Sequence, residues 1–542
     1  MRTLNIARTV ALVMFLWTVF CLLMLNPPEP QDYIQQLTPL RFRGEHSASY
    51  PRPLADTYCH SWDRPGEPNV WTDRPSAYAV KKIEDFGWTR VNSASEARVV
   101  SYRNNYNPSL TDARITTKRK PSDLENAEGL FFAPKEAAML FTRMYFYGDE
   151  NFLNFQAAVL GVDYACPGQI LNHVPGASAF CRKDLIQHYM RDYQKRYKAK
   201  GLDHCYTRSI TPKSYILSET DHCQQFLNEL ETALTKYSED SMPIEWITKN
   251  ARRHKGYGID LIDYKAAQHF LSLYSQSGGS CERPLESHKH LIAQQYINNP
   301  ATIDGRKFDF RIFAMIANVD PFIVLWAPEN GHTRVSDTVF NKTSSDFTTH
   351  ITANVAGTNE GALEYLKERR FNLRELARFF AAELGDPDKW LDEVAFPQVK
   401  SILIHMFRAS QQNLLVKRTG LMEFYGVDFM LDEKLENFYL LEANRRPDVQ
   451  EKNPDLQYRE DQLIQDFAFI AEHLVETGVT TFNPDEFYPY LQAFKPLIDE
   501  TKKDPYFGVL PEECRVPFKE FNPEMETDPM IDSLLLYLKE FN

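Results

Sequence analysis

The chain has 542 residues, of which 43% are hydrophobic and 25% are charged. This length allows three or four domain-sized units, and the composition excludes a disordered, collagen-like or polytopic membrane chain. The 61 lysines and arginines face 74 acidic residues, which gives a net charge of −13. Nucleic acid requires a cationic face, so this balance argues against a nucleic-acid partner.

An uncharged apolar run, Thr9–Leu25, lies near the N-terminus, after Arg2 and Arg8 and before a proline-rich stretch. A helix of that length reaches about 25 Å, close to the thickness of a bilayer core. The charge bias predicts a signal-anchor with residues 1–8 in the cytosol, which makes a single-pass type II membrane protein of the Golgi or ER with a luminal catalytic body. A cleaved signal peptide is an alternative, although no small-x-small site follows the run, and a buried helix is another.

Seven cysteines follow the apolar run, and the spacing leaves their state open. Cys166 with Cys181 and Cys205 with Cys223 are possible bridges, while buried free thiols are an equal alternative. Asn341 begins an Asn-Lys-Thr triplet, which is a potential glycosylation site.

The elements in chain order mix helices and strands. Residues 26–127 are rich in Pro, Arg, Ser and Asn and are expected to form a stem and an irregular region. Apolar periodicity predicts helices over 134–147, 185–200, 221–237, 363–384, 397–415 and 461–476. Short apolar runs predict strands over 215–217, 245–248, 291–297, 308–316, 322–326, 424–431 and 438–441. This alternation indicates α+β domains around a cleft.

A basic, glycine-containing loop follows the strand that ends at Lys249. Lys255, Gly256 and Gly258 lie in this loop, and glycines let backbone N–H groups approach a polyphosphate while lysines neutralise it. A solvated basic turn is the alternative interpretation.

Charged and aromatic residues alternate over the strand that follows Gly305. Lys307, Asp309 and Arg311 share one face of this strand, and Phe308 and Phe310 share the other. The pattern predicts either a strand that lines an anion-binding cleft or an edge strand with one solvated side.

Three oxygen-bearing side chains interrupt two otherwise apolar strands near the C-terminus. These are Asp428, Glu442 and Asn444, and such ligands suit Mg²⁺. The alternative is a structural salt bridge to Arg445 or Arg446, because a buried carboxylate needs a partner.

Seven segments in one order resemble the tubulin–tyrosine ligase-like family, over about residues 165–475. They are residues 171–176, 182–184, 212–217, 246–259, 294–297 with 304–311, 350–354, and 426–428 with 441–444. The resemblance implies the ATP-grasp fold, in which two α+β lobes hold ATP. It also implies a domain order of an N-terminal domain (128–240), a central lobe (241–300), a C-terminal lobe (301–478) and an acidic tail with an amphipathic helix (479–542).

The resemblance also implies roles for individual positions. Nucleotide-binding positions would be Lys249, Lys255, Gly256, Gly258, Gln295, Tyr296, Ile297, Lys307 and Asn354. Catalytic positions would be Asp309, Arg311 and Arg334, and the Mg²⁺ ligands would be Asp428, Glu442 and Asn444. The chain departs from the family pattern at Asn250, Lys255, Ala443 and the Arg445–Arg446 pair, and the last of these bears on the choice of acceptor.

The implied function is an ATP-dependent ligase that forms an amide bond through an acyl phosphate and adds an amino acid to a protein or peptide. Residues 499–542 carry 11 acidic and 5 basic side chains. This charge, with the predicted luminal body, disfavours the acidic tails of tubulin as acceptor. The alternatives are a tubulin-modifying ligase that faces the cytosol and a catalytically silent nucleotide-binding module.

Overall fold

The computed structural model describes residues 69–72, 78–90, 139–141, 170–174, 176–206, 210–251, 258–276, 281, 288, 290–336, 338–342, 344, 346–352, 369–414, 419–445, 447, 454–477 and 483–515. The predicted anchor, residues 9–25, lies outside these residues. Within the described part of the chain, no helix has the length and apolar character needed to cross a membrane.

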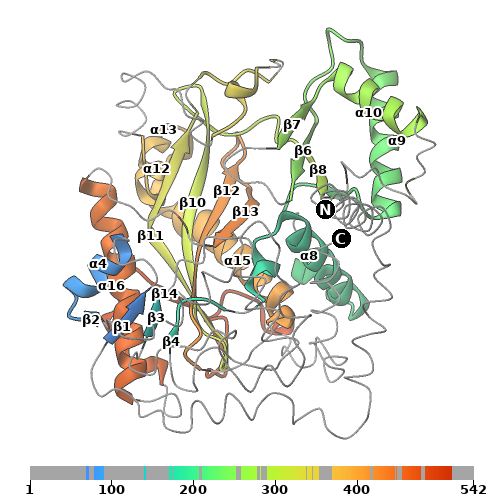
Figure 1. The fold of residues 1–542 in the computed structure, drawn as a ribbon. Helices are drawn as coiled ribbons and strands as arrows, with labels where there is room; N and C mark the ends of the chain where they lie inside the picture. The colour runs from blue at the N-terminus through green and yellow to red at the C-terminus, as the bar shows by residue number, and fades with distance from the viewer. Residues whose placement is uncertain are drawn as a thin grey trace, which may run out of the picture.

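Three sheets organise the described residues (Figure 1). The largest sheet is antiparallel, with strands in the order β13 (Phe438–Arg445), β12 (Glu423–Leu431), β10 (Arg306–Asn318), β11 (Ile323–Val335) and β14 (Lys495–Asp499), and β9 (Thr302–Ile303) pairs with β10. A second antiparallel sheet has the order β5 (Ser214–Ile216), β8 (Leu291–Gln295), β6 (Trp246–Asn250) and β7 (Ile259–Ile262). A small parallel sheet holds β2 (Thr89–Arg90), β1 (Asn69–Thr72), β3 (Met139–Phe141) and β4 (Ile170–Leu171).

Helices cover the sheets on defined faces (Figure 1). The first core of the large sheet includes α8 (Lys183–Ala199) and α15 (Phe396–Ser410), and the second includes α16 (Pro454–Thr477) with α4 (Tyr78–Asp85) beside it. The second sheet packs against α9 (Thr220–Lys236) and α10 (Tyr264–Gln276). Short helices, α12 (Leu373–Phe379), α13 (Ala381–Leu384) and α14 (Pro387–Trp390), lead through a π-helical turn into α15. The α+β class is confirmed, and the two antiparallel sheets fit an ATP-grasp-like fold.

The alternation of β10 explains how one strand serves a core and a cleft. Phe308, Phe310 and Ile312 point into the first core. The opposite face begins with the polar side chains predicted for the cleft and then enters the second core at Phe313 and Met315. A tight turn at Asp304 and Gly305, both with positive φ, joins β9 to β10.

Most of the strongly periodic elements occur where the sequence predicts them, including α8, α9, α15, α16, β10 and β12. The helix predicted over 134–147 is wrong, because β3 occupies part of it and pairs in parallel with β1 and β4. Its short apolar run fits either element, and only pairing with distant strands decides between them.

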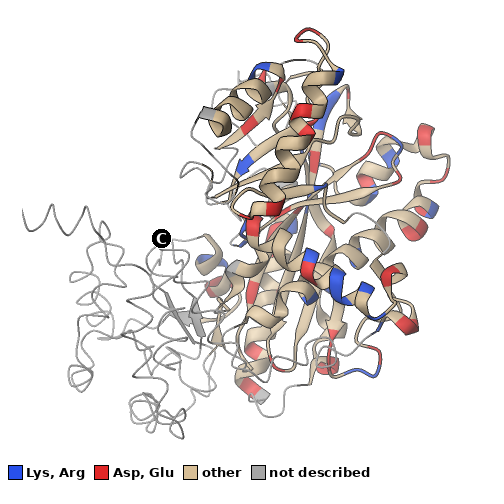
Figure 2. Cartoon of the chain, turned by 90° about the vertical axis from the view of Figure 1, so that its right-hand side faces the viewer, with Lys and Arg blue, Asp and Glu red and all other residues tan. Residues whose placement is uncertain are grey.

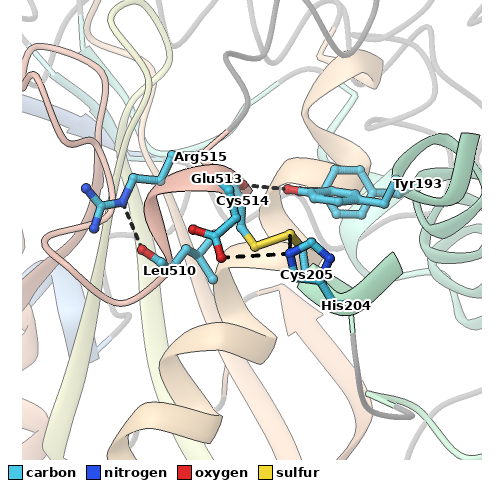
Figure 3. Close-up of a disulfide and its surroundings, with 8 residues drawn as sticks. Tyr193, His204, Cys205, Leu510, Glu513, Cys514 and Arg515 are labelled. Atoms are coloured by element: carbon cyan, nitrogen blue, oxygen red, sulfur yellow. Dashed lines mark hydrogen bonds and ion pairs between the residues drawn. A yellow bond between two sulfur atoms is a disulfide. The ribbon is translucent and has the colours of Figure 1, made fainter. Parts of the chain in front are cut away.

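Of the two possible cysteine pairings, Cys205 with Cys223 is wrong, and Cys166 of the other pair lies outside the described residues. Cys205 is bonded to Cys514 and Cys223 to Cys281. Figure 3 shows the first bridge, with His204 and Glu513 beside it. The two partners are 309 residues apart, and local spacing does not reveal such a pair.

The segment 483–515 completes the large sheet beyond the last long helix. Its strand β14 pairs with β11, and the guanidinium of Arg408 on α15 contacts the carboxylate of Glu500 at 2.5 Å. Leu497 and Ile498 are buried. This segment is therefore part of the folded body.

Candidate active site

Charged residues from four strands of the large sheet meet in a row across one face. Arg311 lies opposite Asp428 in the register of β10 and β12, and Asp428 lies opposite Glu442 on β13. Arg334 on β11 lies opposite Asp309 on β10. The register of the antiparallel strands therefore brings together the predicted catalytic and metal-binding positions.

Asp428 is the centre of this row and is only 1% exposed. Arg311 donates two hydrogen bonds to its carboxylate, from Nε at 2.7 Å and from Nη2 at 2.8 Å. Arg334 Nη2 lies 2.8 Å from the same carboxylate and 2.6 Å from that of Asp309. The burial of the two acids is thus offset by two guanidinium groups. Burial would lower the pKa of Arg334, but the charges of Asp309 and Asp428 raise it above its ordinary value.

Glu442 is held by a residue for which no role was predicted from the sequence. Lys183, the first residue of α8, lies 3.2 Å from the Glu442 carboxylate. Burial alone would raise the pKa of Glu442, but the charges of Lys183 and Lys249 and a hydrogen bond from Asn444 bring it well below its ordinary value. The sequence feature that could have indicated this role is the Arg-Lys-Asp triplet. In it, Arg182 pairs with Asp184 at 2.6 Å, so Lys183 is left to pair with Glu442.

The three predicted metal ligands form a compact oxygen-rich set. The Asn444 amide nitrogen donates to Asp428 at 3.0 Å and to Glu442 at 3.1 Å, so the three side chains are direct neighbours. Two carboxylates and one amide carbonyl are hard oxygen donors, which fits Mg²⁺. The alternative of a structural salt bridge also has partners in the structure, because Asp428 pairs with Arg311 and Arg334 rather than with Arg445.

Two buried lysines lie near this row, Lys249 on the second sheet and Lys307 on the large sheet. Lys249 on β6 donates to the Gln294 side chain at 2.7 Å, and burial lowers its pKa to about 8. Lys307 on β10 is 3% exposed, and burial together with the charge of Lys249 lowers its pKa to about 7. An anion beside either lysine would therefore raise its pKa back toward the ordinary value.

The end of β8 supplies the predicted adenine hinge. The backbone N–H groups of Gln295 and Tyr296 already donate to Lys213 O at 2.7 Å and to Glu245 O at 2.8 Å. Among the described residues, no backbone acceptor is found for the N–H of Ile297. Of the three hinge residues, Ile297 is thus the one with a backbone donor for a ligand.

Several predicted positions lie outside the described residues, namely Lys255, Gly256 and Asn354. Gly258 is described, has a φ of +72°, and accepts a hydrogen bond from Asn250 N at 2.7 Å. This pairing closes the base of the basic loop. Thr352, near the predicted Asn354, donates to the Asp309 carboxylate and brings its segment to the cleft.

Gly426 explains how Arg311 crosses β12. A Cβ at this position would lie 3.0 Å from the side chain of Pro447 and 3.1 Å from both Cδ and Nε of Arg311. The missing side chain leaves the space in which the arginine reaches Asp428.

This fold, with its two antiparallel sheets and the row of charges on the larger one, fits an ATP-grasp-like protein. A sequence model of the Tubulin-tyrosine ligase family matches residues 163–474, which is more than half of the chain. The chain belongs to the Tubulin-tyrosine ligase family.

Three relatives illustrate the range of the family. "Probable tubulin polyglutamylase ttll-9" of Caenorhabditis elegans is 29% identical over 303 residues, which cover 54% of this chain and 66% of the relative. "Protein polyglycylase TTLL10" of Rattus norvegicus is 28% identical over 44% of this chain and 34% of the relative. "Inactive polyglycylase TTLL10" of Homo sapiens is 26% identical over 41% of this chain and 33% of the relative. The chain thus spans between a third and two thirds of the length of these relatives.

These comparisons correct the predicted location. Relatives named as tubulin polyglutamylases and a tubulin glycylase imply an acceptor that a body in the secretory lumen would not meet. The prediction of a luminal type II membrane protein, drawn from the N-terminal apolar run and its flanking arginines, is therefore wrong.

Proposed function

We propose that the chain is an ATP-dependent ligase that joins the amine of an amino acid to a side-chain carboxylate of tubulin. The observation that carries this proposal is the row Arg334–Asp309 and Arg311–Asp428–Glu442, with Lys183, Lys249 and Lys307 around it. Cations in this number suit a polyphosphate and a carboxylate bound side by side. The proposed domain order is an N-terminal domain (128–240), a central lobe (241–300) and a C-terminal lobe (301–478).

The nucleotide would lie between the two sheets. The Ile297 N–H would pair with adenine at the hinge formed with Gln295 and Tyr296. Lys249 and Lys307 would neutralise the phosphates, and the loop with Lys255, Gly256 and Gly258 would cover them together with Asn354. The lowered pKa values of the two lysines support this role, because each returns toward its ordinary value beside an anion.

Asp428, Glu442 and Asn444 would hold Mg²⁺, which neutralises charge on phosphate oxygens when it is bound. Each carboxylate already lies beside a cation, Glu442 beside Lys183 and Asp428 beside Arg311, and carboxylate oxygens are ligands that Mg²⁺ prefers. Lys183 would keep Glu442 oriented toward the ion.

The reaction would proceed in two displacements. An oxygen of the acceptor carboxylate attacks the γ-phosphorus, the bond from that phosphorus to the β,γ-bridging oxygen breaks, and ADP leaves with its electron pair. The amine of the amino acid then attacks the acyl carbon, phosphate leaves, and the nitrogen loses a proton. Arg311 and Arg334 would stabilise the charge that develops on the transferring phosphoryl group, and Asp309 would orient Arg334.

The acceptor would meet local cations rather than a broad basic surface. Figure 2 shows acidic and basic residues interspersed along the described elements in that view. An acidic tail would therefore be attracted by the lysines and arginines of the proposed site, which lie closer to the reacting groups than the charges on the outer surface.

The test uses the full chain with microtubules, ATP, Mg²⁺ and radiolabelled glutamate or glycine in separate reactions. ATP-dependent incorporation into tubulin with either amino acid supports the proposal, and the label identifies the donor. Stable nucleotide binding without incorporation into tubulin or into other proteins of a cell extract would contradict it.

A catalytically silent nucleotide-binding module is the second candidate. The human relative whose name includes "Inactive" shows that loss of activity occurs among similar proteins. In this chain the charged row is complete, which favours an active enzyme. ATP binding without acceptor-dependent ADP release would favour the silent module.

A further inference from the structure

A line of hydrogen bonds joins Lys307 to the segment that follows β11. Lys307 Nζ donates to the Tyr296 hydroxyl at 2.7 Å, and the ammonium lies 4.0 Å from the centre of the same ring. The Tyr296 hydroxyl lies 2.7 Å from His350 Nδ1, and His350 Nε2 lies 2.7 Å from the carbonyl oxygen of Ser344. All three side chains, Lys307, Tyr296 and His350, are buried.

The groups at the two ends of this line, a carbonyl and an ammonium, determine which atom donates in each hydrogen bond. The Ser344 carbonyl only accepts, so His350 Nε2 carries the hydrogen. A neutral imidazole then has its lone pair on Nδ1, which accepts from the Tyr296 hydroxyl. The hydroxyl oxygen in turn accepts from Lys307, so each donor meets an acceptor when His350 is neutral and Lys307 is charged.

The surroundings of His350 favour the neutral form. Burial is the largest cause that lowers its pKa, and the nearby positive charge of Lys307 acts in the same direction. The Ser344 carbonyl and Asp346 oppose this effect. The groups that face Lys307 are Tyr296, the Phe340 ring at 5.8 Å, and the charges of Lys249 and Asp309.

The line also connects separate parts of the cleft. Tyr296 follows β8 of the second sheet, and Lys307 belongs to β10 of the large sheet. The segment with His350 is tied to the large sheet by Phe340 N, which donates to Gly305 O at 2.9 Å, and by Thr352, which donates to Asp309. The hinge and the phosphate end of the cleft are therefore joined through two side chains.

We propose that Tyr296 and His350 form a positioning relay that holds the ammonium of Lys307 toward the nucleotide phosphates. This inference rests on the proposed nucleotide site and goes beyond it, because it assigns roles to a hydroxyl and an imidazole that need not touch the nucleotide. His350 orients the hydroxyl, the hydroxyl orients Lys307, and Lys307 meets the anion.

The decisive experiment is a mutant cycle on nucleotide binding, measured by calorimetry with a non-hydrolysable ATP analogue and without acceptor. Tyr296→Phe removes one oxygen and keeps the ring, and it should weaken binding about tenfold, the effect of one hydrogen bond to a charged group. His350→Leu should do the same, whereas His350→Asn, which can present an acceptor to the hydroxyl, should recover part of the loss. In the Lys307→Met background both effects should disappear, because the relay has nothing left to position.

A matched control separates this role from a structural one. Tyr215 belongs to the second sheet, and its hydroxyl donates to Glu229 at 3.2 Å away from this line. Tyr215→Phe should leave nucleotide affinity unchanged. Losses that persist in the Lys307→Met background, or a Tyr296→Phe variant with native affinity, would overturn the proposal.

A second measurement does not depend on nucleotide binding. In nucleotide-free full chain labelled with ¹⁵N-histidine, the resonance assigned by its loss in His350→Asn should report the Nε2–H tautomer at neutral pH. An Nδ1–H tautomer or an imidazolium would overturn the relay. If the native chain binds no nucleotide, the proposed function fails, and the tautomer still decides the relay.

Discussion

Arg311 and Asp428 face each other across β10 and β12 and are joined by two hydrogen bonds, at 2.7 and 2.8 Å. A metal ion that takes Asp428 as a ligand must compete with this pair and with Arg334. The arginine released from the carboxylate would be available to an anion. The metal and the nucleotide should therefore bind together more readily than either binds alone.

The first prediction follows from this competition. Mg²⁺ alone should bind the full chain at least about tenfold more weakly than Mg²⁺ added with a non-hydrolysable ATP analogue, a coupling of about 1.4 kcal/mol. Calorimetric titrations with and without the analogue measure the difference, after correction for Mg²⁺ bound by free analogue. Equal affinities would show that the guanidinium groups do not compete with the ion.

Glu442→Gln tests the metal ligands by removing a charge while nearly keeping the shape. ATP consumption should be abolished and the fold retained, because the loss is one of charge neutralisation and not of core packing. Glu433→Gln, on the exposed turn between β12 and β13, is the control and should remain active. Full activity of Glu442→Gln would contradict the assignment, and global unfolding seen by circular dichroism would favour a structural ion pair with Lys183.

Arg311→Ala tests stabilisation of the transferring phosphoryl group. Turnover should fall about 10²–10³-fold, the scale for loss of one preorganised donor, while nucleotide affinity changes far less. Arg311→Lys should restore only part of the rate, since an ammonium cannot reproduce the two parallel bonds of a guanidinium. Acceptor-dependent ADP release measured beside calorimetric binding separates the two effects.

The structure adds a control to this experiment. Arg311 also neutralises a buried acid, so Arg311→Ala should lower the free energy of unfolding, and denaturant curves must accompany the kinetics. Arg374→Ala on α12 removes only the partly exposed pairs with Glu329 and Asp388 and should affect neither quantity. Equal losses of binding and turnover in Arg311→Ala would make it a ground-state nucleotide contact.

The pH dependence of nucleotide binding follows from the two buried lysines. Their pKa values in the nucleotide-free chain are about 7 for Lys307 and about 8 for Lys249, both below the ordinary value. At pH 8.5 both are largely neutral, and phosphates favour the charged forms, so binding should take up protons. Nucleotide affinity should fall as pH rises above 8, by up to about tenfold per pH unit for each lysine that takes up a proton on binding. Calorimetry in buffers of different ionisation enthalpy measures the uptake, and binding without proton uptake would contradict the placement of the lysines at the phosphates.

The same shifts give the sign of a stability effect. Between pH 7 and 10 the unfolded chain binds more protons at these two lysines than the folded chain does. Their contribution to the free energy of unfolding of the nucleotide-free protein should therefore increase with pH across that window. Lys307→Met should flatten this part of the pH profile.

Gly426→Ala tests the close crossing of Arg311 over β12. The added methyl group would press on Pro447 and on the Arg311 side chain, and the arginine would have to move by a few tenths of an ångström. Turnover should fall about tenfold to a hundredfold with little change in the thermal midpoint, because positioning is lost and the core is untouched. A variant with native turnover would show that the Arg311 geometry tolerates displacement.

The sequence predicts which charged residues lie together in the row on the large sheet, because strand alternation is a local property. Lys307, Asp309 and Arg311 alternate in the sequence, so they share one face of any strand. The apolar residues around Asp428 and Glu442 identified the segments that contain them as strands. The sequence did not reveal the contact of Lys183 with Glu442 or the line from Lys307 to His350, since both depend on how distant segments pack. The cysteine partners and β3 were not predicted for the same reason. The charges that flank the apolar N-terminal run led to the wrong prediction of location.

The bond between Cys205 and Cys514 closes a covalent ring that contains both antiparallel sheets and every described residue proposed for catalysis except Lys183. A single cut in any loop between these cysteines therefore opens the ring without separating its pieces. A protease acting on the basic loop after β6 would yield a chain that migrates intact on a non-reducing gel and splits into two fragments once a thiol is added. The bridge thus makes the two lobes one molecule even where the backbone between them is broken.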